Sequence, residues 1–260
     1  MDDWLYRVDL SIILAVSVGM FLAVIEIGFR LGRRSQSMDE HSRSQIAAVQ
    51  GAILGMLALL LGFTFAMSMS RFETRKQLVL EEANAIGTTF LRTQMLPEPQ
   101  RQEISDLLRR YVEARIQFYQ SGIDLKRLRQ ANLFTEQLHK QLWSRAAALG
   151  ATDPRAVMTG LFLQSLNEVI DLHAKRLTAL ENRVPGIIFV LLYFVALTAT
   201  GLIGYGCGLA GRRNFFVTLV AAGLIAAVIL VIIDLDRHRR GFIQVSQQRL
   251  IELRDSLAEY

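Results

Sequence analysis

Four long runs of apolar residues alternate with polar stretches along the chain. They occupy residues 10–31, 46–70, 184–206 and 214–235. A helix needs about 20 predominantly apolar residues to cross the roughly 30 Å hydrocarbon core of a bilayer, and each run meets that length. We therefore predict four transmembrane helices.

The polar stretch between the second and third runs, residues 71–183, is expected to be helical as well. Neither Pro nor paired Gly interrupts residues 46–95, so the second membrane helix should continue into water until the LPEP sequence at 96–99 ends it. Apolar residues then recur with the spacing of a helix over 102–120 and again over 125–149.

A further helix outside the membrane is indicated by the sequence TDPRAV. Asp153 is a suitable N-cap and Pro154 suits the first helical position. This helix can run to Pro185, which opens the third membrane run. A last helix is expected over residues 241–258.

Together these patterns predict an all-α membrane protein. It has four transmembrane helices and a long helical cytosolic region between spans two and three, and its second helix extends out of the membrane. The sequence shows no internal repeat, low-complexity linker or alternating strand pattern. Because helices outside the membrane extend those inside it, we expect residues 1–260 to form a single domain.

The composition agrees with a membrane protein. Hydrophobic residues make up 52% of the sequence, only four Pro occur, and the net charge is +5. The first apolar run lacks a small-residue cleavage site and is longer than the hydrophobic region of a signal peptide, so we expect it to be retained. The single cysteine, Cys207, cannot form an intramolecular disulfide.

Positive charges do not by themselves decide which side of the membrane each loop faces. The short loops carry Arg33, Arg34, Arg212 and Arg213, which the positive-inside rule would place in the cytoplasm. The opposite ends of the apolar runs are basic too. A long segment without a signal peptide or disulfides is more simply left in the cytoplasm, so we place both termini and residues 71–183 there.

The second apolar run contains the most informative pattern, QGAILGMLALLLGFTFAMS at residues 50–68. Wound at about 100° per residue, it separates into three faces. One face is bulky and apolar. Another is a stripe of small residues that lets a neighbouring helix approach closely. We predict helix packing through the members of this stripe Gly51, Gly55, Ala58 and Gly62.

The third face of this helix is apolar in the middle and polar at both ends. It consists of Gln50, Leu54, Leu57, Leu61, Thr64 and Ser68. Such a face is typical of a constriction between wetter vestibules, so we predict that it lines a pore in a homo-oligomer and gates by dewetting at its leucines. In the alternative interpretation, Thr64 and Ser68 bond to carbonyls one turn earlier and Gln50 lies at the headgroup level.

Charged residues near the membrane allow two interpretations each. Glu26 lies inside the first run, where an ionisable group is a functional hypothesis, but Arg30 is one turn away and can pair with it. Glu81, Glu82 and Asn84 would form a polar ring if the second helix continued a pore axis, or a packing face between helices.

Asp234 and Asp236 end the fourth run beside Arg237 and form either an interfacial charge cluster or a gating element. The sequence offers no catalytic or metal-binding constellation. His173 is two positions from Asp171, so the two point to different sides of a helix. No HExxH motif or phosphate-binding Gly loop occurs. We therefore expect no enzyme, no cofactor and no nucleic-acid partner.

Three segments resemble those that mark a known family. GFTFAMSMSRFETRKQLVLEEANAIGTTFLR, LNEVIDLHAKRLTALENRVP and DLDRHRRGFIQVSQQ are similar to segments of a widespread, uncharacterised bacterial membrane-protein family regarded as distantly bestrophin-like. The resemblance covers most of residues 46–255. It implies a multi-pass protein of the bacterial inner membrane.

Bestrophins are pentameric ion channels with four spans per chain, a pore-lining second helix and a helical cytosolic region between spans two and three. The resemblance therefore implies a lipid-embedded homo-oligomer, a pentamer by analogy, that conducts ions. The Pro-rich, Phe-containing pore motif of animal bestrophins is missing and their calcium-clasp cluster has no match, so neither selectivity nor calcium gating is implied. The alternative is a membrane-anchored helical scaffold or sensor that binds a protein partner through residues 71–183.

Overall fold

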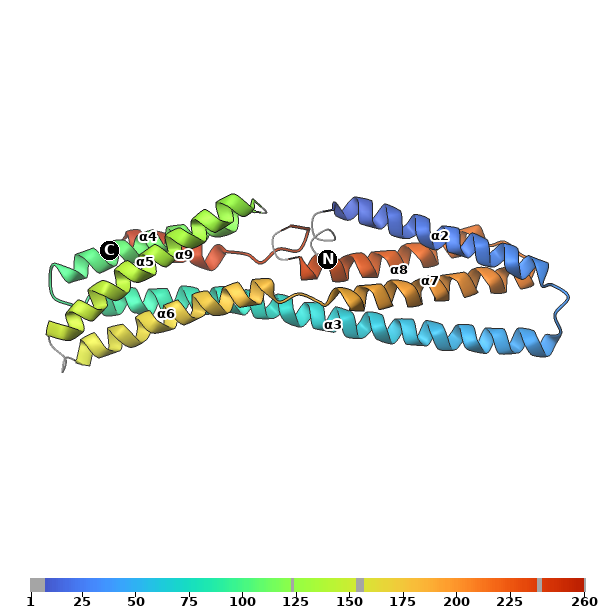
Figure 1. The fold of residues 1–260 in the computed structure, drawn as a ribbon, viewed down its shortest axis with the longest axis horizontal. Helices are drawn as coiled ribbons and strands as arrows, with labels where there is room; N and C mark the ends of the chain where they lie inside the picture. The colour runs from blue at the N-terminus through green and yellow to red at the C-terminus, as the bar shows by residue number, and fades with distance from the viewer. Residues whose placement is uncertain (1–7, 123, 153–156, 238–239, 260) are drawn as a thin grey trace. The chain divides into compact units, whose positions relative to one another are not determined.

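The computed structural model describes residues 8–122, 124–152, 157–237 and 240–259. Within these ranges the regular structure is helical and no strand occurs, which confirms the all-α fold (Figure 1). The helices are α2 (Leu10–Arg34), α3 (Glu40–Thr93), α4 (Gln100–Gln120), α5 (Leu125–Thr152), α6 (Val157–Glu181), α7 (Gly186–Leu209), α8 (Phe215–Asp236) and α9 (Gln248–Ala258).

The chain divides into two compact units, each with its own apolar core. Among the described residues, the first unit contains 8–70, 183–237 and 241–243, and the second unit contains the remainder. Helix α3 contributes its residues up to Ser70 to the first unit and those from Arg71 onward to the second. The organisation as a single domain stays a prediction.

The first unit consists of α2, α7, α8 and the first part of α3, which run side by side (Figure 1). Its core is formed by large apolar and small side chains that interlock between these helices, including Phe21, Leu57, Leu192, Ala196, Ala226 and Ile229. Four helical stretches are long and apolar enough to cross a membrane, and α7 is the apolar part of the third. These stretches are Leu10–Arg34, Glu40–Thr93, Val157–Leu209 and Phe215–Asp236. The four predicted spans are therefore present.

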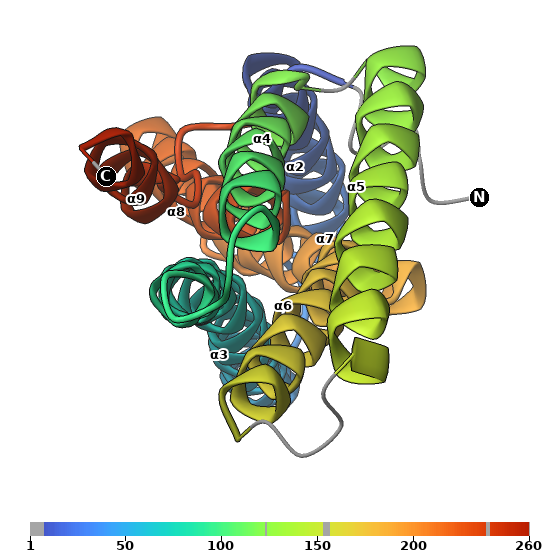
Figure 2. The same cartoon turned by 90° about the vertical axis from the view of Figure 1, so that its left-hand side faces the viewer.

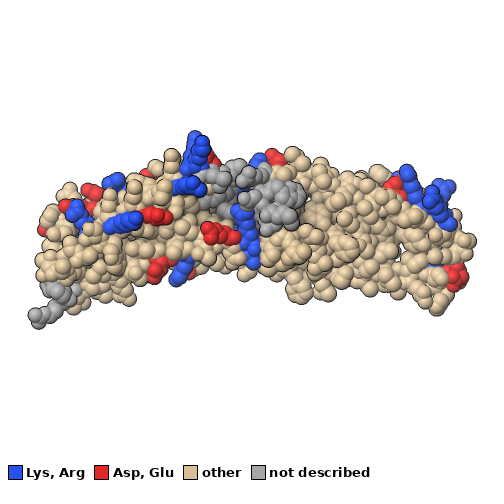
Figure 3. All heavy atoms as spheres, viewed as in Figure 1, with Lys and Arg blue, Asp and Glu red and all other residues tan. Residues whose placement is uncertain are grey.

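Charged side chains are sparse on the visible face of the first unit. In the view of Figure 3 most of its length is uncharged, and the Lys and Arg side chains gather at the end where α2 connects to α3. This distribution suits a hydrocarbon-facing belt with a basic margin, because charged groups are expensive within a bilayer.

Helices α2 and α7 pack closely through glycines. A Cβ added to Gly28 would overlap the carbonyl oxygen of Gly201, and one added to Gly204 would overlap the carbonyl oxygen of Ile25. Gly32 meets the backbone of α7 in the same way. Small residues give such contacts in lipid, where backbones that approach closely gain van der Waals contact. The sequence signal for this contact is a pair of glycines four residues apart on each helix, at 28 and 32 and at 204 and 208, and the packing of α2 on α7 was not predicted from it.

The second unit contains α4, α5, α6, α9 and the second part of α3, which face the viewer in Figure 2. Helix α4 contacts both α5 and α9, and α5 also contacts α6. Fully buried apolar side chains from all these helices form the core, among them Ile86, Phe90, Leu108, Leu142, Phe162 and Leu250. Each such side chain contributes roughly 1.5–3 kcal/mol through removal from water, so the second unit has a stabilising apolar core of its own.

The C-terminal helix begins at Gln248, seven residues after the predicted start at 241. Gly241 has a φ of +137°, which does not belong to a helix. The following backbone N–H groups, of Phe242 and Ile243, donate to the Asp234 carboxylate at distances of 2.9–3.2 Å. This segment is thus attached to the end of α8 instead of forming a helical turn. The predicted cap at Asp153 and Pro154 lies outside the described residues.

Candidate functional site

The six residues predicted to line a pore lie on the face of α3 that packs inside the first unit. Leu57, Thr64 and Ser68 are 2%, 3% and 0% exposed. Leu54 and Leu61 are half-buried and pack against the core of the unit. Gln50 lies beside α7, because its Oε1 is 3.0 Å from the position that a Cβ on Gly206 would take.

The two hydroxyl groups of this face differ in their bonding. Thr64 Oγ1 donates to the Leu60 carbonyl at 2.6 Å, as the alternative interpretation expected. The Ser68 hydroxyl is buried and has no hydrogen-bond partner among the described residues. This face is thus largely covered by the chain's own helices, and its role in lining a pore stays a prediction.

The opposite face of α3 is not covered by any of the described parts of the chain. A Cβ added to Gly51, Gly55 or Gly62 would meet no atom within 4 Å. Leu59 and Phe63, on neighbouring turns, are 63% and 71% exposed. The glycines of the small-residue stripe therefore have no close neighbour among the described residues, and their predicted packing role stays a prediction that concerns a second copy.

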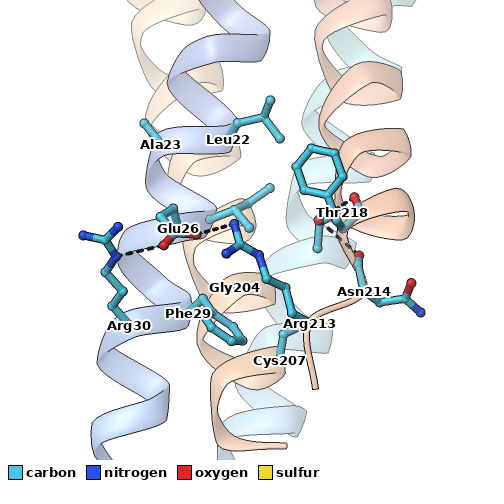
Figure 4. A pocket seen from close by; sticks show the side chains of 12 residues that line it. Leu22, Ala23, Glu26, Phe29, Arg30, Gly204, Cys207, Arg213, Asn214 and Thr218 are labelled. Carbon is cyan, nitrogen blue, oxygen red and sulfur yellow. Dashed lines mark hydrogen bonds and ion pairs between the residues drawn. The ribbon is translucent and has the colours of Figure 1, made fainter. Parts of the chain in front are cut away.

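A cavity of about 460 Å³ lies in the first unit between α2, α7 and α8 (Figure 4). Its lining includes the apolar side chains of Leu22, Phe29 and Phe215 and the polar groups of Glu26 and Thr218. Cys207 also lines it, so the one cysteine of the sequence is partly accessible here.

Glu26 carries two ion pairs beside this cavity (Figure 4). Arg30 Nε lies 2.8 Å from its Oε1, which confirms the predicted pairing within α2. Arg213, from the loop before α8, lies 2.7 Å from Oε2, and its guanidinium is 5.6 Å from the centre of the Phe29 ring. The sequence did not indicate the pairing of Arg213 with Glu26, because 187 positions separate the two residues. The carboxylate thus connects α2 with the α7–α8 loop.

The two aspartates that end α8 bind backbone N–H groups. Asp236 is fully buried, and both of its carboxylate oxygens accept from the Val184 N–H at 3.2 Å. Asp234 is 3% exposed and accepts from Phe242 and Ile243. Both residues therefore hold chain segments that enter or leave the membrane helices, and a gating role is not tested by these contacts.

In the second unit, Glu82 forms the centre of a buried polar cluster. Its carboxylate accepts from Arg115 Nε at 2.8 Å, from the Tyr111 hydroxyl at 3.3 Å, and from Arg176. Burial alone would raise the pKa of Glu82, but the charges of Arg115 and Arg176 outweigh it and lower the pKa to about 2. Of the two interpretations, packing between helices is the one that fits Glu82. Glu81 and Asn84 are exposed.

Two histidines lie next to this cluster. The ring centres of His139 and His173 are 4.9 Å apart, with the planes nearly perpendicular, and the Tyr111 ring is 5.0 Å from that of His139. Burial, and secondly the charge of Arg115, lowers the pKa of His139 to about 4 and that of His173 to about 3. Both imidazoles are thus neutral in the folded protein near pH 7.

The chain is similar to a known protein family in sequence and to solved structures in fold. A family model described as the Bestrophin-like domain matches residues 15–250. A mutant crystal structure of a bacterial bestrophin homolog from Klebsiella pneumoniae is similar with a TM-score of 0.70 and 16% identity over 96% of this chain and 98% of that one. Another structure of the K. pneumoniae homolog has a TM-score of 0.65 at 16% identity, with coverages of 96% and 98%.

A crystal structure described as a membrane protein is also similar, with a TM-score of 0.67 and 16% identity over 96% of this chain and 97% of that one. No match was found among curated proteins. At these identities the solved structures establish the fold, while the family rests on the sequence match over most of the chain.

Proposed function

The chain belongs to the bestrophin-like family, and on that basis we propose that it is one subunit of a homo-oligomeric ion channel in a bacterial inner membrane. The observation that carries this proposal is the uncovered face of α3. A helix that crosses the bilayer and leaves one side free of its own chain is suited to meet other copies around an axis. Analogy with bestrophins makes the oligomer a pentamer.

The uncovered side of α3 has the two surfaces that a ring of helices needs. The stripe with Gly51, Gly55 and Gly62 is free of side chains, so the backbone of a neighbouring α3 can approach it. Leu59 and Phe63 lie beside this stripe and point away from the core of the unit. We place these two apolar side chains at the axis, where they form a hydrophobic constriction that gates by dewetting.

This proposal moves the pore from the predicted face to the uncovered one. Helix α3 keeps its pore-lining role, but Leu57 and Leu61 become part of the packing between helices of one subunit. Thr64 and Ser68 then serve the interior of the subunit.

We also propose that both termini and residues 71–183 lie in the cytoplasm. In a Cys207→Ser background, a cysteine placed at Ser37 should react with a membrane-impermeant thiol reagent in intact cells. A cysteine placed at Ser121 should react only after lysis. Labelling of the second position alone in intact cells would reverse the topology.

The experiment that tests the channel combines two measurements on one preparation. Light scattering of the detergent-purified protein should give a single oligomer, and the same material in lipid vesicles should pass ions down a gradient. A monomer, or an intact oligomer without flux in the parent and in a protein with a widened constriction, would contradict the proposal.

One observation favours a second function. The polar-ended face of α3 is buried within a single chain, as expected of a membrane-anchored scaffold whose second unit binds a protein partner. An intact oligomer that never conducts would support this alternative.

A further inference from the structure

The buried polar cluster of the second unit contains more positive than negative charge. Glu82, Arg115 and Arg176 are 0%, 0% and 2% exposed and come from α3, α4 and α6. One carboxylate therefore faces two guanidinium groups inside the unit. A buried charge is costly unless an opposite charge lies beside it and its hydrogen-bonding groups have partners.

Both terminal nitrogens of Arg176 have a hydrogen-bond partner. Its Nη1 donates to Glu82, and its Nη2 donates to Gln247 Oε1 at 3.0 Å. The guanidinium also lies 4.4 Å from the centre of the Tyr119 ring, within the range of a cation–π interaction. The charge of Arg176 is thus accommodated by the protein itself.

Arg115 also lies over an aromatic ring, with its guanidinium 5.2 Å from the centre of the Phe118 ring, but its hydrogen-bond donors are satisfied only in part. Its Nε donates to Glu82, but its two terminal nitrogens are buried and have no hydrogen-bond partner among the described residues. A guanidinium has five N–H donors in a fixed plane, and four of them belong to these two nitrogens. Buried donors nearly always have a hydrogen-bond partner, so these two nitrogens indicate an acceptor from outside the described residues.

The two buried histidines contribute further hydrogen-bonding groups next to the Glu82 cluster. His139 Nε2 and both ring nitrogens of His173 are buried without a partner among the described residues. The neighbouring rings connect them through Tyr111 to Glu82 and Arg115. A neutral imidazole offers one N–H, so three helices, α4, α5 and α6, present guanidinium or imidazole groups that lack a partner among the described residues.

From this geometry we propose that the second unit binds a small monovalent anion, of the halide class, at Arg115, His139 and His173. A halide accepts hydrogen bonds from several directions and neutralises the excess charge of the cluster. Water would satisfy the donors and leave the charge. The guanidinium disfavours a metal cation at this place. Such an anion connects α4, α5 and α6 and stabilises the unit, independently of conduction through α3.

The first test measures thermal unfolding of the purified full chain at constant ionic strength. Replacing sodium gluconate by sodium chloride or bromide should raise the melting temperature with a saturable dependence on halide. His173→Phe keeps the three charged side chains and removes one donor. It should raise the half-saturating halide concentration about tenfold, the effect of losing one hydrogen bond to a charged group.

The matched control is Arg145→Gln. Arg145 is an exposed residue of α5 that pairs with Glu103 at 3.0 Å, so the change removes one positive charge without touching the cluster. Its halide dependence should equal that of the parent. Equal melting temperatures in gluconate and halide, or an unchanged halide dependence in His173→Phe, would overturn the proposal.

Bromide diffraction gives the second test and does not require any variant to fold. Crystals of the parent grown with bromide should show an anomalous peak within hydrogen-bonding distance of the terminal nitrogens of Arg115. Ordered water at this position without an anomalous signal would refute the site. Neither experiment measures flux, so the anion site and the channel can fail separately.

Discussion

The placement of the pore face can be decided by one chemical change at two positions of α3. Leu57 and Leu59 are two residues apart on the same membrane helix, and they are 2% and 63% exposed in one chain. Leu57 belongs to the core of the first unit, whereas Leu59 points away from it. We expect Leu→Ser to have opposite consequences at the two sites.

At Leu57 the substitution removes a fully packed side chain. Large-to-small changes in a core cost about 2–5 kcal/mol, since the neighbouring helices close the gap only in part. Leu57→Ser should therefore lower the yield and thermal stability of the protein without opening a path for ions. At Leu59 more than half of the side chain has no neighbour to lose, so the cost should stay below about 1 kcal/mol.

The functional effect is expected at Leu59 alone. If a ring of Leu59 side chains excludes water from the axis, a hydroxyl at this position wets the constriction and raises ion flux. The assay is ion flux into dye-loaded vesicles, normalised to the amount of reconstituted oligomer. Phe63→Ser, one turn further along the same surface, should act in the same direction.

The refuting result is specific. Increased flux through Leu57→Ser, with Leu59→Ser like the parent, would return the pore to the face with Gln50 and Thr64. Parent-like flux in both variants, with the oligomer intact, would remove α3 from the conduction path.

Three further predictions concern packing and the buried cluster. Gly28→Ala should prevent α2 from packing on α7 and destabilise the subunit itself, whereas Gly55→Leu should leave the subunit folded and weaken the oligomer, as measured by melting temperature and light scattering. Glu82→Gln should cost about 3–5 kcal/mol because it leaves two buried guanidinium groups without their carboxylate, while Glu81→Gln on the exposed side should be nearly neutral. Burial lowers the pKa of His173 from 6.5 to about 3, so between these pH values the unfolded state binds more protons than the folded state. The free energy of unfolding should therefore fall as the pH drops from about 6.5 toward 3, and His173→Phe should flatten this slope in unfolding titrations.

Local patterns in the sequence determined the membrane spans and the helical character of the region between them. A span depends only on whether about 20 consecutive residues are apolar, so neighbours in space do not enter. The continuity of α3 through Ser70 was predictable in the same way, since no Pro or Gly pair interrupts it. At 241 the same reasoning failed, because the contacts of the Asp234 carboxylate replace a helical turn.

Only the tertiary structure decided which side of α3 is covered. In water an amphipathic helix buries its apolar stripe, but in lipid the leucines at 57 and 59 are equally compatible with hydrocarbon and with a protein interior. The choice depended on the shapes of α7 and its neighbours, where Gly206 leaves room for Gln50. The pairing of Glu26 with Arg213 and of Glu82 with Arg115 likewise joins helices far apart in the sequence, and charges gain partners only when the chain has brought those helices together.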